Sequence, residues 1–151
     1  MSLTAGLRSL FGGKPGRPRP PKLRVSQVWS IRDDPSARVR ILIARFDKTT
    51  IELDGVSQVV NCVHVSVTGT RHLELLDGQL SDGNLSHMPF TRAAVEASVR
   101  ELTSTGREPP PKFEAAYQDW KRNGSDAVLT DPVAEEIELL YKTHTEFMKD
   151  L

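Results

Sequence analysis

Four histidines and one cysteine are the side chains with the clearest potential for catalysis or metal binding. His64 follows Cys62 by two residues in an alternating apolar stretch, so both side chains are expected on one face of a strand, as in half of a metal site. The chain has no second cysteine, and His72, His87 and His144 fall in segments that the sequence does not place beside His64. We therefore expect the reactive side chains not to converge, and predict neither a metal site nor a cofactor.

Nucleophilic catalysis would make the protein a hydrolase that uses His87 or His64. Ser86 and His87 are adjacent, but neighbouring loop residues point in different directions, and no serine lies in a Gly-x-Ser-x-Gly motif. His72 and Glu74 alternate onto one face of an expected strand, in the manner of a base and its orienting acid. Such pairs arise by chance in most proteins. We predict that the protein is not an enzyme and keep the hydrolase as the third alternative.

Basic and aromatic side chains in the first half of the chain point to nucleic acid as the second alternative. Arg38 and Arg40 alternate along one expected strand, and Trp29 lies on the strand before it. Small barrels bind single-stranded nucleic acid through such groups. Residues 25–151, however, carry 14 basic and 20 acidic side chains, and this negative charge opposes contact with phosphate.

The first 24 residues differ from the rest of the chain in charge and composition. They contain six basic side chains and no acid, and residues 12–21 hold four prolines and three glycines. Such a segment forms neither a helix nor a central strand. We expect residues 1–24 to be a disordered basic leader, which is either an electrostatic arm or a solvated tail, and residues 25–151 to form a single α+β domain.

Residues 25–78 are expected to form the β part of this domain. Apolar runs bounded by turn signals such as Asp54-Gly55 indicate strands. We predict five strands, over residues 25–31, 38–46, 48–53, 57–68 and 71–76. Their short lengths and close spacing predict a small antiparallel, partly curled, SH3-like sheet of four to five strands. The polar residues 79–86 are expected to form a loop.

Residues 89–151 change to helical periodicity and predict three helices. The first is expected over residues 91–103, with Thr91 as its N-cap and Gly106 as its C-cap. The last begins at the Asp131-Pro132 pair, with the aspartate as N-cap and the proline in the first helical position. The buried face of this last helix is expected to comprise Val133, Ile137, Leu140, Tyr141, His144 and Met148.

The middle helix carries an aromatic stripe and should end at Gly124. Phe113, Tyr117 and Trp120 follow one another at i, i+4 and i+7, so they share one face. One interpretation is a binding ridge, because tyrosine and tryptophan are enriched at interface hot spots. The simpler interpretation is that the stripe packs against the sheet as part of the core.

Six short motifs occur along most of residues 25–141: Val28-Trp29-Ser30-Ile31, Val39-Arg40-Ile41-Leu42, Val63-His64-Val65-Ser66-Val67, His87-Met88-Pro89-Phe90, Tyr117-Gln118-Asp119-Trp120-Lys121 and Pro132-Val133-Ala134-Glu135. Together they resemble a family of small bacterial proteins that has no established activity. The resemblance implies an SH3-like β half followed by a helical half. In its size and in the acidic composition of residues 25–151 the chain is also similar in outline to the immunity proteins that neutralise toxins in interbacterial competition.

The leading prediction is a non-enzymatic protein-binding module, an immunity-like or regulatory partner of another bacterial protein. A cytoplasmic location is expected, because the apolar runs are too short to span a membrane and a single cysteine cannot form an intramolecular disulfide. The alternative is a nucleic-acid-binding small barrel assisted by the basic leader. The candidate binding surface comprises Trp29, Arg38, Arg40, His64, His87, Tyr117 and Trp120. The oligomeric state stays open.

Overall fold

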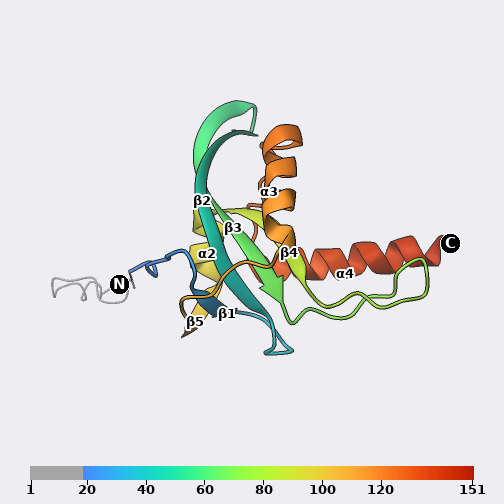
Figure 1. Ribbon diagram of the computed structural model, residues 1–151. Coiled ribbons are helices and arrows are strands. Elements are labelled where there is room, and N and C mark those ends of the chain that lie inside the picture. Colours follow the sequence, from blue (N-terminus) through green and yellow to red (C-terminus); the bar gives the residue numbers. More distant parts are fainter. Residues whose placement is uncertain (1–18) are drawn as a thin grey trace, which may run out of the picture.

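The computed structural model describes residues 19–151, so the predictions for residues 1–18, which cover most of the leader, lie outside the described residues. The strands are β1 (Val28–Ile31), β2 (Arg40–Leu53), β3 (Val56–Thr68), β4 (Leu85–Thr91) and β5 (Val99–Ser104). The helices are α2 (Arg92–Ser98), α3 (Lys112–Asn123) and α4 (Val133–Lys149). All strand pairs are antiparallel, in the order β4-β3-β2-β1-β5 (Figure 1). The α+β class is confirmed; within residues 19–151 the sheet stays open, so the SH3-like closure is not confirmed.

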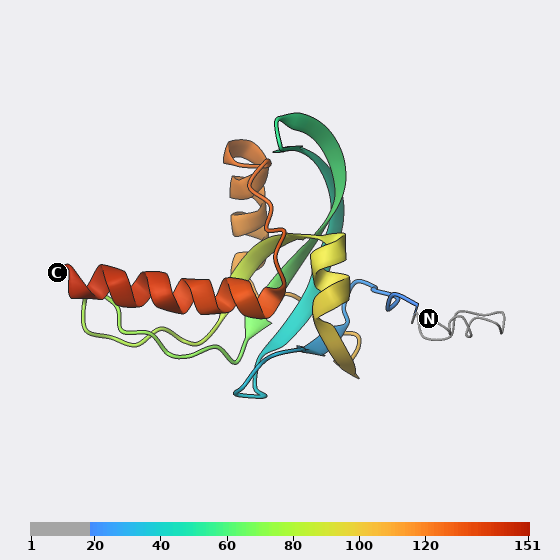
Figure 2. The ribbon, with the colours of Figure 1, turned by 180° about the vertical axis from the view of Figure 1, so that it is seen from behind.

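A single long hairpin, β2–β3, forms the centre of the sheet. Its turn is at Asp54 and Gly55, whose φ angles of 53° and 78° match the left-handed pair of a tight hairpin turn. The separate strands expected over 38–46 and 48–53 are one strand, with an irregularity in register between Ile43 and Arg45. The outer half of the hairpin extends beyond its neighbours and curves beside α3 (Figures 1 and 2).

The helix expected over residues 91–103 is shorter, and its second half is a strand. Thr91 is the N-cap as predicted, because its side chain accepts a hydrogen bond from the Ala94 amide. The helix ends at Ser98, however, and β5 follows at once and pairs with β1. The chain adopts extended geometry at Val99, where a β-branched residue meets the unpaired edge of β1. Gly106 is therefore not a helix cap.

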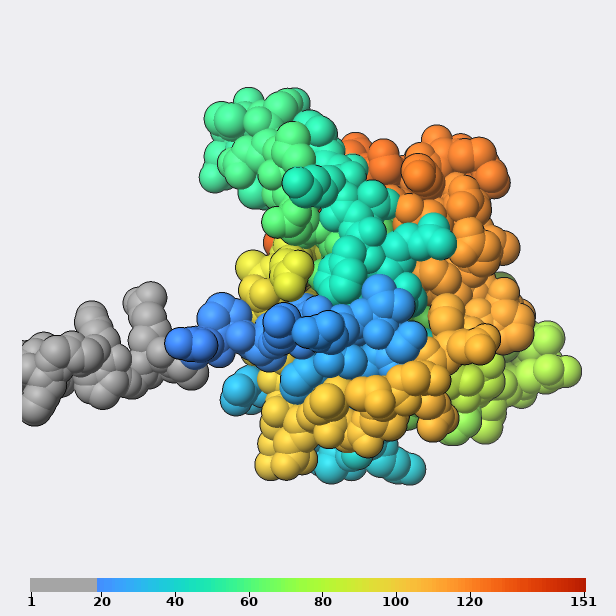
Figure 3. Space-filling model, turned by 60° about the vertical axis from the view of Figure 1, so that its left-hand side comes forward, coloured from blue at the N-terminus to red at the C-terminus, as the bar shows by residue number. Residues whose placement is uncertain are grey.

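The other edge of the sheet also differs from the prediction. The strand expected over residues 71–76 is absent from the described fold, where this segment makes one bridge, between Glu74 and Leu80. The edge strand is β4, which begins at Leu85 inside the predicted loop and pairs with β3. Edge strand β5 lies beside β1 (Figure 3); it carries Arg100 and Glu101, and charged side chains discourage pairing with further strands.

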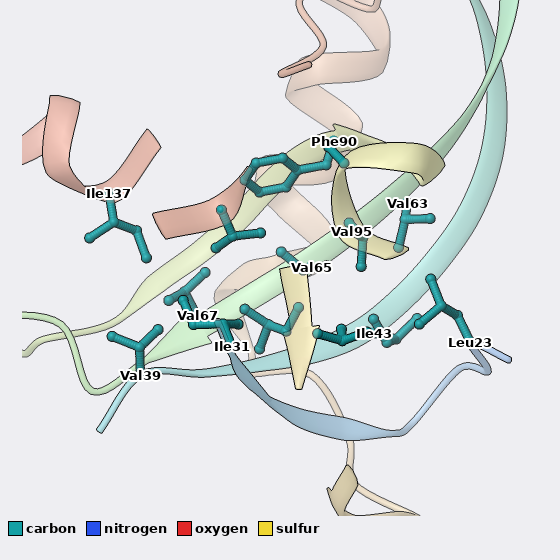
Figure 4. Packing of buried hydrophobic residues seen from close by; sticks show 14 of the residues in the cluster. Leu23, Ile31, Val39, Ile43, Val63, Val65, Val67, Phe90, Val95 and Ile137 are labelled. Carbon is teal, nitrogen blue, oxygen red and sulfur yellow. The ribbon is translucent and has the colours of Figure 1, made fainter. Parts of the chain in front are cut away.

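The two faces of the sheet carry different helices. Val63, Val65 and Val67 alternate along β3 onto the face covered by α2 and α4, where the main core lies (Figure 4). Cys62 and His64 point to the opposite face, which α3 covers, as the two-residue period of a strand requires. Core packing starts at Leu23, two residues before the position where order was expected to begin.

The last helix lies half on the sheet and half beyond it. Pro132 is its N-cap, so the helix starts one residue later than expected. Val133, Ile137 and Tyr141 are buried as predicted, whereas the remaining members of the predicted face, Leu140, His144 and Met148, are only half-buried. The outer half projects with residues 71–84 alongside (Figures 1 and 2). Of the helices in residues 19–151, none has the length and apolar character needed to cross a bilayer.

Candidate functional site

Two histidines that are 23 residues apart in the chain meet beneath α3. His64 on β3 and His87 on β4 lie with Nδ1 and Nε2 2.9 Å apart, and their rings stack at a centroid distance of 5.1 Å. The pairing of β3 with β4 brings them together, because His64 pairs with Pro89, and His87 lies two residues before Pro89 on the same strand. The expectation that the reactive side chains do not converge is therefore wrong.

The second ring nitrogen of His64 faces two further polar groups. Nε2 lies 3.6 Å from the Cys62 sulfur and 3.8 Å from Oδ2 of Asp47. The Tyr117 hydroxyl donates to the same Asp47 oxygen at 2.5 Å. Two hydrogen-bonded pairs, His64 with His87 and Tyr117 with Asp47, thus lie side by side across β4, β3, β2 and α3, and the second pair joins the helix to the sheet.

The aromatic stripe of α3 encloses these two pairs. The rings of Tyr117 and Trp120 meet His64 edge-on at centroid distances of 4.8 and 4.6 Å, and Phe113 meets His87 in the same way at 5.6 Å. All three aromatic residues are buried. The core interpretation of the stripe is therefore the one that the structure supports, and Gly124 ends the helix as predicted.

Burial decides the protonation of this cluster. Burial, with the neighbouring His87 as the second cause, lowers the pKa of His64 to about 4, and burial lowers the pKa of His87 as well. Burial and the nearby Asp47 carboxylate raise the pKa of the Cys62 thiol to about 12. At neutral pH the site therefore holds two neutral imidazoles and a thiol, and a buried thiol lacks the nucleophilicity of a thiolate.

Asp47 is the one member of the cluster that is ionised at neutral pH. Burial opposes its charge, but the hydrogen bonds from Tyr117 and from the Lys48 amide outweigh burial and lower its pKa, with smaller contributions from Lys121 and, once it is protonated in acid, from His64. Hydrogen bonds donated to a carboxylate stabilise its charged form in the folded state. Its role in the structure is to anchor α3 through the Tyr117 hydroxyl.

The cluster lacks the surroundings of a ligand site. In the part of the chain that the structure describes, no three His, Cys, Asp or Glu side chains are placed to hold a metal ion, so the half-site of Cys62 and His64 is not completed there. The principal hollows of residues 19–151 are lined by neither His64 nor His87. The reaction available to this arrangement is protonation of the His64 and His87 imidazoles, which would place positive charge in a packed interior.

The remaining predicted site residues lie apart from the cluster. Trp29 is half-buried on β1, and its Nε1 donates to Oε1 of Gln27 at 3.0 Å. The guanidinium of Arg40 donates to two backbone carbonyls at 3.1 and 2.9 Å. Arg38 is exposed at the rim of a different hollow. The structure thus gathers four of the seven predicted residues and does not assemble Trp29, Arg38 and Arg40 into one surface.

An exposed apolar surface is the feature that the sequence interpretation missed. It comprises the loop beside α4, the outer half of that helix and the residues that follow it. We call it the apolar arm, and its members are Leu75, Leu76, Leu80, Phe147 and Leu151. Their exposed fractions range from 44% to 73%. The two segments touch where His144 Nε2 lies 2.7 Å from the Glu74 carbonyl oxygen. The apolar face predicted for the last helix contains none of these members, so the periodicity of that helix did not reveal them.

Comparison of the chain with protein-family models, with curated proteins and with solved structures finds no match. The resemblance to small bacterial proteins therefore stays a prediction.

Proposed function

We propose that the protein is a non-enzymatic protein-binding module and that the apolar arm is its binding surface. The single observation that carries the proposal is the exposure of five large apolar side chains on two adjacent segments, the loop around residues 75–80 and the outer end of α4 with Leu151. Figures 1 and 2 show the two segments side by side. Extended apolar surface of this kind, with polar residues around it, is typical of interaction sites.

The arm adds little to the stability of its own domain. The outer half of α4 projects beyond the sheet, so side chains such as Leu76 and Phe147 remain largely in water. Full burial of one such side chain is worth about 1.5–3 kcal/mol. A complex in which a partner covers the arm would gain this free energy of burial, whereas the isolated domain does not.

The charges around the arm favour a basic partner surface. Residues 71–84 contain three acids and one arginine, and the outer half of α4 with the two residues after it, residues 141–151, contains two acids and two lysines. We infer a partner protein with an apolar patch bordered by lysine and arginine, because complementary charges accelerate association and exclude other partners. An immunity-like or regulatory role toward another bacterial protein is consistent with such a surface.

Matched double variants test the proposal. Leu76→Ser with Phe147→Ser removes apolar area from the arm, and Val59→Ser with Leu102→Ser removes similar exposed area from the hairpin and β5, where these residues are 70% and 45% exposed. Each protein is cross-linked in lysate, and the bound proteins are quantified by mass spectrometry. We expect one stoichiometric protein to be captured by the wild type and the control, and at least about tenfold less by the arm variant.

Two results would contradict the proposal. One is a partner that the arm variant retains as well as the control does, while circular dichroism shows both variants folded. The other is capture of nucleic acid without a stoichiometric protein, which would instead support the nucleic-acid alternative and its steep dependence on salt.

A further inference from the structure

A hollow of about 440 Å³ lies at the inner end of α4, away from the apolar arm. The connection between β1 and β2, the segment after β3 and α4 form its walls. Its apolar lining includes Ile31, Val39, Ala134 and Ile137, and Tyr141 adds an aromatic ring. The volume falls in the range of pockets that bind small molecules, which are also mainly apolar with a few placed polar groups.

The rim of the hollow is built by internal hydrogen bonds. The Asp34 carboxylate accepts from the Ser36 amide at 3.0 Å, the Ser36 hydroxyl at 2.7 Å and the Val39 amide at 2.9 Å. On the opposite wall Gly69 has a φ of 80°, and a Cβ there would lie 2.1 Å from the Arg38 carbonyl oxygen. The two walls are therefore in direct backbone contact, and the hollow exists without a ligand.

Two of the five charged side chains in the lining, Arg71 and Glu138, are paired with each other. The Arg71 guanidinium lies 4.3 Å from the centre of the Tyr141 ring and 3.9 Å from a Glu138 oxygen, so these two charges offset each other. The Asp33 carboxylate has no ion pair within residues 19–151, and it also lines an adjoining hollow with Arg32 and Arg100.

The Arg38 guanidinium has neither an ion pair nor a hydrogen bond to any group within residues 19–151. Its backbone amide, by contrast, donates to the Ser36 hydroxyl. Its side chain is exposed at the mouth of the hollow. A ligand that enters the hollow therefore meets one cation that is not already neutralised.

Tyr141 supplies a second polar group without a complete set of partners. Its hydroxyl oxygen accepts the Arg71 amide at 2.9 Å, and the residue is only 8% exposed. No acceptor for the hydroxyl proton lies within hydrogen-bond distance among residues 19–151. A buried donor without an acceptor is costly, and an oxygen of a bound molecule would satisfy it.

We propose that this hollow binds a small organic carboxylate. The carboxylate accepts hydrogen bonds from the Arg38 guanidinium and the Tyr141 hydroxyl, and its apolar body packs against Ile31, Val39 and Ile137. An arginine with a hydroxyl donor is a typical recognition pair for a carboxylate. The apolar walls select an alkyl or aryl carboxylate over a small inorganic anion.

Titration of the isotope-labelled protein with hexanoate, followed by amide NMR, tests the site. We expect saturable shifts at Gly69, Thr70 and Arg71, with a Kd on the order of 1 mM for a ligand of this size. Hexanamide matches its shape without the charge and should bind at least about tenfold more weakly, since a charged hydrogen bond is lost. Inorganic phosphate should produce no saturable shift at these amides.

Two variants and a control separate the polar contacts from the shape of the hollow. Arg38→Gln replaces an exposed side chain with one of similar length and no charge, and should weaken the binding of hexanoate about tenfold. Tyr141→Phe removes the hydroxyl donor and should weaken the binding several-fold. Arg107→Gln, on a different part of the surface, should leave the Kd unchanged. The absence of saturable shifts at tenfold the expected Kd would overturn the proposal. Equal binding of hexanamide, or full affinity in Arg38→Gln, would do the same. None of these results depends on the apolar arm.

Discussion

Acidification should destabilise the protein through His64. The side chain is fully buried, and its pKa of about 4 lies below the ordinary value of 6.5. The unfolded chain therefore takes up a proton near pH 6.5, whereas the folded protein takes it up only near pH 4. The free energy of unfolding is highest above pH 6.5, falls as the pH drops from 6.5 to 4, and changes little further from this group below pH 4.

The size of the effect follows from the two pKa values. Each pKa unit corresponds to about 1.4 kcal/mol, so His64 contributes a total loss of about 3 kcal/mol. About 2 kcal/mol of this loss is complete between pH 7 and pH 5, because the unfolded imidazole is then mostly protonated and the folded one is not. The lowered pKa of the adjacent His87 acts in the same direction and adds to the slope.

Urea unfolding of the wild type and His64→Gln at pH 8 and pH 5 measures this contribution. The pH 8 comparison gives the cost of the altered packing and of the hydrogen bond to His87, because both states of the wild type then hold a neutral imidazole. From pH 8 to pH 5 the wild type should lose about 2 kcal/mol more than His64→Gln. An equal loss in both proteins would refute the assignment of the acid sensitivity to His64.

Four substitutions test other features by urea unfolding. Tyr117→Phe should cost about 1.5–3 kcal/mol, since its hydroxyl donates to the ionised Asp47, and should raise the pKa of Asp47 in an NMR titration; an unchanged pKa would contradict this. Gly55→Ala should cost about 1–2 kcal/mol from its positive φ alone, because nothing lies near its Cβ position. Gly69→Ala should cost several times more, owing to the backbone clash, and an equal cost would be inconsistent with it. Phe90→Ala should cost about 3–5 kcal/mol as a core cavity.

Local signals in the sequence predicted the elements that depend on a few neighbouring residues. Asp54-Gly55 turns the hairpin, because both residues adopt positive φ and glycine does so without strain. Thr91 caps α2 and Gly124 ends α3, since these signals act on backbone groups within one helical turn. The alternation of Cys62 and His64 against the valines of β3 is also local, because strand geometry alone sets it.

The edges of the sheet could not be predicted in this way. Residues 99–104 continue the helical periodicity of α2, but the open side of β1 offers them a ladder of backbone hydrogen bonds. Residues 71–76 have the alternation of a strand and find no such ladder in the described fold. Both outcomes depend on which edge is free, and that follows from strands far away in the chain.

The sequence by itself determined the α+β class, the central hairpin and the opposite faces of β3, because these follow from periodicity and turn chemistry. Only the tertiary structure decided that His64 meets His87, that the aromatic stripe of α3 is core, and that the far end of α4 is uncovered. Each of these depends on where the sheet stops and which helix lies over it. Val59 belongs to the same alternating strand as the buried Val63 and is 70% exposed, because the hairpin extends beyond the helices that bury the rest of β3.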